Sequence, residues 1–365
     1  MGFNCGIVGL PNVGKSTLFN ALTEAAQADA ANYPFCTIEP NVGRVPVPDP
    51  RLHQLAEVAK SRDVIPTQLE FVDIAGLVRG ASKGEGLGNQ FLGNIREVDA
   101  IVHLLRCFEG ETSHVDGGVD PVRDAEAVET ELMLADLESV ERQLDQARKK
   151  ARGGDKDAVA KKPLLERLAA ALGEGKRARE VEVAPEEQGH LKEMHLLTRK
   201  PVLYVANVGE DEVATGNAHS ERVAEHARTQ GAGCITIAAA IEAEVAALPT
   251  AEEKRAFLDD LGLSESGLDR VIKAGYTLLD LITFFTAGPK EARAWTTVRG
   301  ATAPEAAGVI HSDMQRGFIR AETIHWQDFV ELGGEAPAKD AGRMRVEGRD
   351  YVVQDGDVMH FRFNV

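Results

Sequence analysis

The chain has 365 residues, a formal net charge of −17 at pH 7, 43% hydrophobic residues and 27% charged residues. This length suits two or three domains, and the acidic charge argues against indiscriminate nucleic-acid binding, so we expect no DNA partner. No apolar run reaches the ~18 residues of a membrane span, so we expect no membrane partner. The first residues lack a basic signal region, and the four cysteines show no CxxC spacing. Together these features predict a cytoplasmic protein.

Short apolar runs separated by helical stretches predict a doubly wound α/β domain around a parallel sheet. In chain order, these runs are Cys5–Val8, Leu69–Val72, Ala100–Leu105, Val202–Ala206 and Ile235–Ile237.

The alternation of strands and helices breaks between about residues 120 and 200. Apolar residues spaced by four and three, typical of a coiled-coil seam, are Met133, Leu137, Val140, Leu144, Ala147 and Ala151. A Gly153-Gly154 turn follows, and the pattern resumes at Leu165, Leu168 and Leu172. We predict a helical hairpin that is inserted into the α/β domain and projects as an arm. The alternative is two ordinary covering helices, against which the charged stretch RKKARGGDKD argues.

After about residue 278, short strand candidates surround one helix-like segment, Pro304–Gln315, which predicts a small α+β domain with its own core. The strand candidates are Leu281–Thr286, Ala292–Val298, Tyr351–Val353 and Val358–Phe363. The chain is thus divided into the α/β domain (1–122 and 200–278), the arm (123–199) and a C-terminal domain (279–365).

The first apolar run leads into a complete G-x-x-x-x-G-K-[ST] motif at residues 9–16, and the helical pattern Ser16–Ala25 follows it. Backbone N–H groups of such a loop wrap the β-phosphate at the positive end of the helix. We expect Lys15 to reach the β- and γ-oxygens and Ser16 to bind Mg²⁺. The phosphate-binding residues predicted here are Asn12, Val13, Gly14, Lys15, Ser16 and Thr17.

A D-x-x-G motif, Asp73 to Gly76, follows the second apolar run. At this distance from a phosphate loop, we expect Asp73 to hold the metal and the Gly76 N–H to sense the γ-phosphate. Between the two motifs, Thr37 is a candidate for a further Mg²⁺ ligand.

The stretch GLVRGASKGEGLGNQFLGNIREVDAIVHLLRCF, which follows this motif, resembles the Obg-like ATPases of the YchF family, within the translation-factor-related P-loop GTPases. The resemblance runs nearly end to end. It implies a nucleotide domain, an inserted coiled-coil arm and a C-terminal TGS domain of the β-grasp type.

The fourth apolar run ends where guanine-selective GTPases carry Asn-Lys-x-Asp, but this chain has Asn207, Val208 and Glu210 at the three defined positions. Glu210 is one methylene too long for the seat of the Asp, and Val208 removes the Lys stem that covers the ring. Loss of paired hydrogen bonds strongly disfavours guanine, whereas Asn207 can contact N7 and N6 of adenine. Ala239, where GTPases carry Ser-Ala-Lys, supplies only backbone donors. We predict that ATP and ADP are preferred over GTP; the resemblance implies the same.

Hydrolysis needs a group that orients the attacking water, and Leu77 replaces the Gln that many GTPases place after D-x-x-G. His114, in a polar loop after the third run, is the candidate because a neutral imidazole can orient or deprotonate water near pH 7. The resemblance points to the same histidine. Lys15 and Mg²⁺ would stabilise the charge of the transition state.

Basic residues gather near the predicted hairpin tip, namely Arg148, Lys149, Lys150, Arg152, Lys156, Lys161 and Lys162. They are either a solvated helix face or a patch that binds RNA. The resemblance implies ribosome association through the arm and the TGS domain, and we expect a monomer. A nucleotide-sensing scaffold that hydrolyses little ATP and acts through protein partners is the alternative function.

Cys36 precedes the candidate ligand Thr37. It is either a small residue without a redox role or a thiol whose oxidation displaces Thr37. The resemblance favours the second hypothesis.

Overall fold

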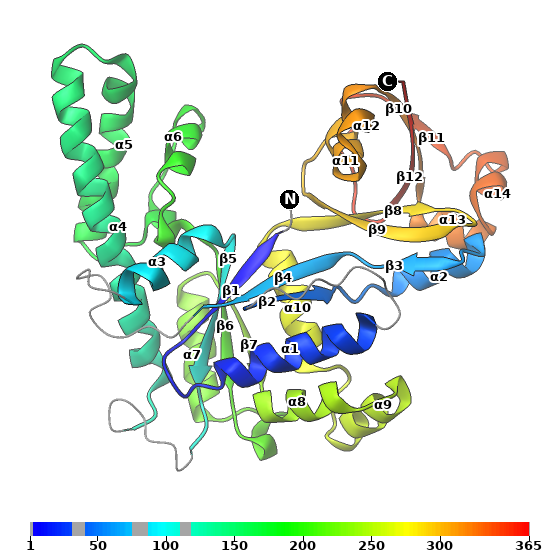
Figure 1. The fold of residues 1–365 in the computed structure, drawn as a ribbon, viewed down its shortest axis with the longest axis horizontal. Coiled ribbons are helices and arrows are strands. Elements are labelled where there is room, and N and C mark those ends of the chain that lie inside the picture. Colours follow the sequence, from blue (N-terminus) through cyan, green and yellow to red (C-terminus); the bar gives the residue numbers. More distant parts are fainter. Residues whose placement is uncertain (1–2, 31–40, 75–86, 110–117, 365) are drawn as a thin grey trace.

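The computed structural model describes residues 3–30, 41–74, 87–109 and 118–364. Figure 1 shows a central α/β unit, a helical arm that projects from it, and a C-terminal α+β unit that projects on the other side. The predicted α/β fold with an inserted helical hairpin and an α+β domain is therefore confirmed. Within the described ranges, no helix is both long enough and apolar enough to cross a membrane.

The first sheet has the strand order β2-β4-β1-β5-β6-β7, and all its neighbours are parallel except β2 and β4. Its strands are β1 (Asn4–Val8), β2 (Val42–Pro46), β4 (Gln68–Asp73), β5 (Ala100–Arg106), β6 (Val202–Asn207) and β7 (Gly233–Ile237). The helices of this unit are α1 (Lys15–Ala30), α3 (Leu87–Glu97), α7 (Ala218–Thr229), α8 (Ala239–Ala247), α9 (Ala251–Asp260) and α10 (Gly267–Leu278). Every residue of β5 is buried, as expected for a strand covered on both faces.

The arm is built on α4 (Pro121–Arg152) and α5 (Lys156–Gly173), which pack along each other. Its own core contains Val140, Leu144, Leu165 and Leu168, as the coiled-coil seam predicts. Gly154 has a φ of +87°, a left-handed conformation that favours glycine at the turn between the helices. The chain returns through η2 (Ala178–Glu180), η3 (Pro185–Glu187), α6 (Gln188–Glu193) and η4 (Leu197–Arg199).

The root of α4 belongs to the nucleotide domain rather than to the arm. Val128, Leu132 and Ala135 join the hydrophobic core of the first sheet. Farther along α4, Val140, Leu144 and Ala147 join the core of the arm, so one continuous helix connects the sheet to the tip of the arm (Figure 1).

The second sheet has the order β11-β10-β12-β8-β9-β3. Its strands are β3 (Asp63–Ile65), β8 (Leu281–Ala287), β9 (Glu291–Val298), β10 (Phe318–His325), β11 (Arg345–Glu347) and β12 (Asp357–Phe363). Its helices are α2 (Pro50–Ala59), α11 (Ala303–Ile310), α12 (Ser312–Arg316), α13 (Trp326–Leu332) and α14 (Glu335–Asp340).

Three sequence expectations for this unit need correction. The predicted helix Pro304–Gln315 is two helices, because His311 is extended (φ −160°, ψ 140°) and its Nδ1 accepts a hydrogen bond from the Asp313 N–H. The predicted strand Tyr351–Val353 forms only an isolated bridge from Val352 to Thr302. The sequence prediction also omitted β10, which pairs with both β11 and β12.

The segment 50–65, which the sequence division assigned to the nucleotide domain, completes the C-terminal unit. β3 extends the second sheet by pairing in parallel with β9. Leu52 and Leu55 of α2 pack in one core with Phe285 and Phe329. Arg51 and Asp355 form an ion pair of 2.7 Å across the same contact. The C-terminal unit is therefore joined to the nucleotide domain by two chain segments that are distant in sequence.

Candidate nucleotide-binding site

The phosphate loop lies between β1 and α1, at the carboxyl end of the parallel strands. Its conformation requires left-handed backbone at Asn12 (φ 62°) and Gly14 (φ 94°). A Cβ atom on Gly14 would lie 2.3 Å from Nδ2 of Asn207, so glycine is required by both conformation and space. The Leu18 N–H donates to the Gly14 carbonyl (2.9 Å), which begins α1 and leaves the N–H groups of its first turn free for an anion.

Lys15 and Asp73 meet at this edge, with 3.9 Å between Nζ and Oδ1. Burial lowers the pKa of Lys15, and the charge of Asp73 partly opposes this shift. Asp73 Oδ1 is buried and has no hydrogen-bond partner among the described residues. A buried carboxylate oxygen without a hydrogen-bond partner destabilises the folded state unless a ligand contacts it. Mg²⁺ prefers carboxylate and hydroxyl oxygens as ligands. Asp73 and the exposed Ser16 at the start of α1 therefore fit a magnesium site.

Asn207 joins the phosphate loop to the base-recognition side. Its Nδ2 donates to the Val13 carbonyl and its Oδ1 accepts from the Ala239 N–H, both at 2.9 Å. The side chain is only 4% exposed. Asn207 thus braces two loops, a role that the sequence prediction did not include, while its contact with adenine stays a prediction.

The two other base-motif positions differ in exposure. Val208 is 3% exposed and packs in a hydrophobic core, and its N–H donates to the Ile237 carbonyl at 2.8 Å. Glu210 begins the short helix η5 (Glu210–Glu212) and is exposed. The carboxylate that fixes this loop belongs to Glu212, which accepts from the Gly209 N–H (3.2 Å) and from Asn217 Nδ2 (2.7 Å).

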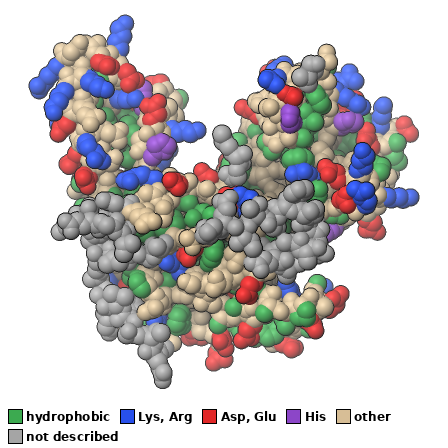
Figure 2. Space-filling view, in the orientation of Figure 1, with side chains coloured by type: hydrophobic (Ala, Val, Ile, Leu, Met, Phe, Trp, Pro, Cys, Tyr) green, Lys and Arg blue, Asp and Glu red, His purple; other side chains and the backbone are tan. Residues whose placement is uncertain are grey.

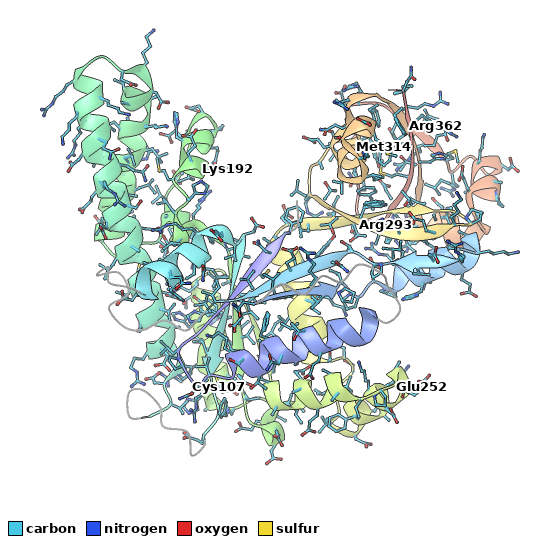
Figure 3. The ribbon with its side chains drawn as sticks, viewed as in Figure 1. Cys107, Lys192, Glu252, Arg293, Met314 and Arg362 are labelled. Carbon is cyan, nitrogen blue, oxygen red and sulfur yellow. The ribbon has the colours of Figure 1, made fainter. Side chains whose placement is uncertain are left out.

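Arg106 was missed by sequence reasoning although it ends β5 beside the phosphate loop. Its side chain is 2% exposed, and its Nη1 donates to the Asn12 carbonyl at 3.5 Å. The guanidinium also lies 4.6 Å from the ring centroid of Phe108. Figure 3 labels the next residue, Cys107, at the edge of the sheet near the start of α1. A charged residue inside an apolar strand was the available signal, because burial of an arginine requires partners.

Several predicted site residues lie outside the described residues. They are Thr37, Gly76, Leu77 and His114, together with Cys36. Their predicted roles stay predictions.

The basic residues at the tip of the arm fall into two groups, those that form ion pairs and those that are exposed. Arg148 and Lys162 both contact Glu166, and Lys161 contacts Asp157 and Glu193. The remaining four, Lys149, Lys150, Arg152 and Lys156, are exposed. Figure 2 shows Lys and Arg side chains around the tip of the arm, and Asp and Glu side chains along the opposite, lower edge of the nucleotide domain.

Comparisons with known proteins cover the whole chain. Residues 4–148 match a family described as a 50S ribosome-binding GTPase. Residues 281–364 match the C-terminal family of YchF GTPases, which is described as a protein of unknown function.

Curated relatives match at full length. The chain is 58% identical over 366 residues to the Ribosome-binding ATPase YchF of Haemophilus influenzae and 56% identical over 368 residues to that of Bacillus subtilis, each covering 100% of both chains. The solved structure of the Schizosaccharomyces pombe YchF GTPase is 37% identical, with a TM-score of 0.90 over 99% of this chain and 98% of that one. The names of these relatives differ in the nucleotide, but the sequence and the fold agree that the chain belongs to the YchF family.

Proposed function

We propose that this protein is a Mg²⁺-dependent ATPase that prefers adenine nucleotides and works as a ribosome-associated switch in the cytoplasm, as a monomer. The observation that carries the adenine preference is the base loop, in which Val208 points into the core and Glu210 stands exposed. The bacterial relatives are named ribosome-binding ATPases, which supports the same function.

The base preference follows from what this loop lacks. A guanine-selective site needs a short carboxylate for N1–H and the 2-amino group, and an aliphatic stem over the ring. Val208, with its side chain in the core, covers no ring, and the longer Glu210 side chain is exposed. Adenine needs neither interaction, so only the affinity for guanine nucleotides is lowered.

The phosphates and the metal would be held by the residues already grouped at the carboxyl edge. Backbone N–H groups from Asn12 to Thr17 bind the phosphates, with Lys15 on the β- and γ-oxygens. Ser16 and Asp73 would hold Mg²⁺, which would neutralise charge on the phosphates; Thr37, which lies outside the described residues, is the third proposed ligand. His114 orients the attacking water.

Restoring the guanine-binding residue types at positions 208 and 210 tests this assignment. The double variant Val208→Lys, Glu210→Asp should shift the ratio of ADP to GDP affinity toward GDP, whereas Asp211→Asn, in the same short helix, should leave the ratio unchanged. An unaltered ratio in the double variant, with ADP still bound, would mean that another element reads the base.

Ribosome association would use the arm tip. Lys149, Lys150, Arg152 and Lys156 project from a protein of net charge −17, so cations that can meet phosphates are concentrated at the end of the arm. The C-terminal TGS domain is the second expected RNA contact.

Co-sedimentation with ribosomes at increasing salt, with and without ATP, tests this contact. Replacing Lys150 and Arg152 by Ala should weaken binding and its salt dependence. The control replaces two exposed arginines outside the arm, Arg228 and Arg255, and should bind as wild type does. If neither wild type nor variants sediment with ribosomes, and little ATP is hydrolysed, the scaffold function replaces this proposal.

A further inference from the structure

One side chain, Asn217, connects the base loop after β6 to the segment that follows β5. Its Nδ2 donates to the Cys107 carbonyl at 2.6 Å and to Glu212 Oε2 at 2.7 Å. The same Glu212 oxygen accepts from the Gly209 N–H at 3.2 Å. A continuous chain of hydrogen bonds therefore runs from the base loop to the end of β5. We call Gly209, Glu212, Asn217 and Cys107 the base-loop clamp.

The oxygen of the same amide is anchored to α7. Asn217 Oδ1 accepts from the backbone N–H groups of His219 and Ser220, at 3.0 Å and 2.9 Å, as the N-cap of this helix. Gly216, which precedes the cap, has a left-handed φ of +71°, and its N–H donates to the Glu212 carbonyl at 2.7 Å. The nitrogen of the Asn217 side chain is therefore presented to both loops from a fixed position.

The two segments that the clamp connects both border the proposed nucleotide site. Asn207, which braces the phosphate loop, immediately precedes the base loop, and its carbonyl accepts from the Cys107 N–H at 2.8 Å. Cys107 is buried and follows Arg106, whose Nη1 contacts the Asn12 carbonyl. Ligands of open parallel sheets bind outside the carboxyl ends of the strands, where these two segments lie. The distance between them is therefore part of the geometry of the base site.

The two glutamates of the base loop differ in what their carboxylates contact. Glu210, at the motif position, is exposed, whereas Glu212 is half-buried. Glu212 Oε2 accepts both of the carboxylate's bonds in the clamp, one from the loop backbone and one from Asn217. Glu212 therefore fixes the backbone of the loop, which makes it a positioning residue rather than a group that reads the base directly.

We propose that the base-loop clamp sets the preference for adenine, by holding the Gly209 backbone at the distance from the end of β5 that adenine-specific hydrogen bonds require. This inference rests on the proposed function, in which guanine finds no matched contacts in the base loop. Hydrogen bonds weaken when donor and acceptor move beyond about 3.2 Å. Release of the loop therefore lowers the affinity for ADP, while GDP, held mainly by its phosphates, keeps its affinity.

Asn217→Ser separates the clamp from the helix cap. A serine hydroxyl can still cap α7, but it is too short to contact both Cys107 and Glu212. In calorimetric titrations, we expect ADP affinity to fall by about tenfold, as weakened hydrogen bonds would cause. GDP affinity should stay as in the wild type, so the ratio of ADP to GDP affinity falls. The control Glu221→Gln, at an exposed position on α7, should keep the wild-type ratio.

Substitutions of Glu212 give a second test. Because both clamp bonds of this side chain end on one oxygen, the amide oxygen of Glu212→Gln can accept both, and this variant should keep the ratio. Glu212→Met has a similar length but no comparable acceptor, and it should lower ADP affinity as Asn217→Ser does. Rescue by Gln would assign the effect to the hydrogen bonds rather than to the charge of Glu212. Urea denaturation shows whether each variant is folded.

The possible outcomes separate this inference from the proposed function. If the wild type prefers ADP and both Asn217→Ser and Glu212→Met keep its ratio, the clamp is overturned and the proposed function stands. Equal losses of ADP and GDP affinity would also overturn the clamp, because general disruption of the site lowers both. A wild type without ADP preference would overturn the proposed function and the clamp with it. If Asn217→Ser does not fold, the comparison of Glu212→Met with Glu212→Gln decides.

Discussion

The bracing role of Asn207 predicts that a change of one atom in its side chain weakens nucleotide binding without altering base preference. Asn207→Asp has the same shape and keeps an oxygen for the Ala239 N–H. It replaces the Nδ2 donor by an oxygen, 2.9 Å from the Val13 carbonyl. One buried hydrogen bond becomes a contact between two acceptors, at a cost of about 1–3 kcal/mol.

Part of this cost should appear as nucleotide affinity, because the bond joins the phosphate loop to the base side. Each 1.4 kcal/mol that disfavours the binding geometry lowers affinity tenfold, so a cost of up to about 3 kcal/mol should lower ADP affinity by up to about 10²-fold. Calorimetric titrations of ADP and GDP, with urea denaturation, measure both effects. Asn20→Asp, at an exposed position on α1, is the matched control.

Two results would refute the bracing role. Wild-type affinity and stability in Asn207→Asp would show that the bridge is unimportant. A change in the ratio of ADP to GDP affinity would show that Asn207 instead reads the base.

Three further predictions follow from the proposed site and from the buried carboxylate of Glu129, which contacts Tyr204, His226 and Arg177. Lys15→Ala should abolish productive ATP binding and Ser16→Ala should mainly weaken the Mg²⁺ dependence, as metal titrations of ATPase activity will show. His114→Ala should lower turnover by about 10²-fold or more with ATP affinity little changed; steady-state turnover equal to wild type would return the role to an unidentified group. Burial alone would raise the pKa of Glu129, but its hydrogen bonds hold it at about 2, below the usual 4.5. Its stabilisation is therefore complete above pH 4.5 and is lost as pH falls toward 2. Glu129→Gln should flatten the fall in unfolding free energy over this window, and an unchanged acid profile would contradict the assignment.

The parts of the fold that local pattern determines were predictable. Apolar runs located all five parallel strands of the first sheet, and the seam from Val140 to Leu172 located the arm. Parallel strands buried on both faces are continuous apolar runs, and a coiled-coil seam repeats over many turns, so both signals are strong.

Pairing across long sequence distances was not predictable. β3 joins the sheet of β9, and the exposed, charged character of Asp63 resembles a loop. The bend at His311 also left no clear signal, because the residues on either side fit a helix.

In the site, the phosphate-loop motif identified Lys15 and Ser16 because those chemical types at that spacing have one common use. The partners of Asn207 depend on how β6 and β7 stand beside the phosphate loop, which only the folded sheet determines.

The central claim, that the protein is an adenine-nucleotide switch, is tested most directly by parallel calorimetric titrations of the wild-type protein with ADP and GDP in Mg²⁺. The base loop of Val208 and Glu210 predicts that ADP binds more tightly than GDP. Equal affinity, or tighter binding of GDP, would contradict it.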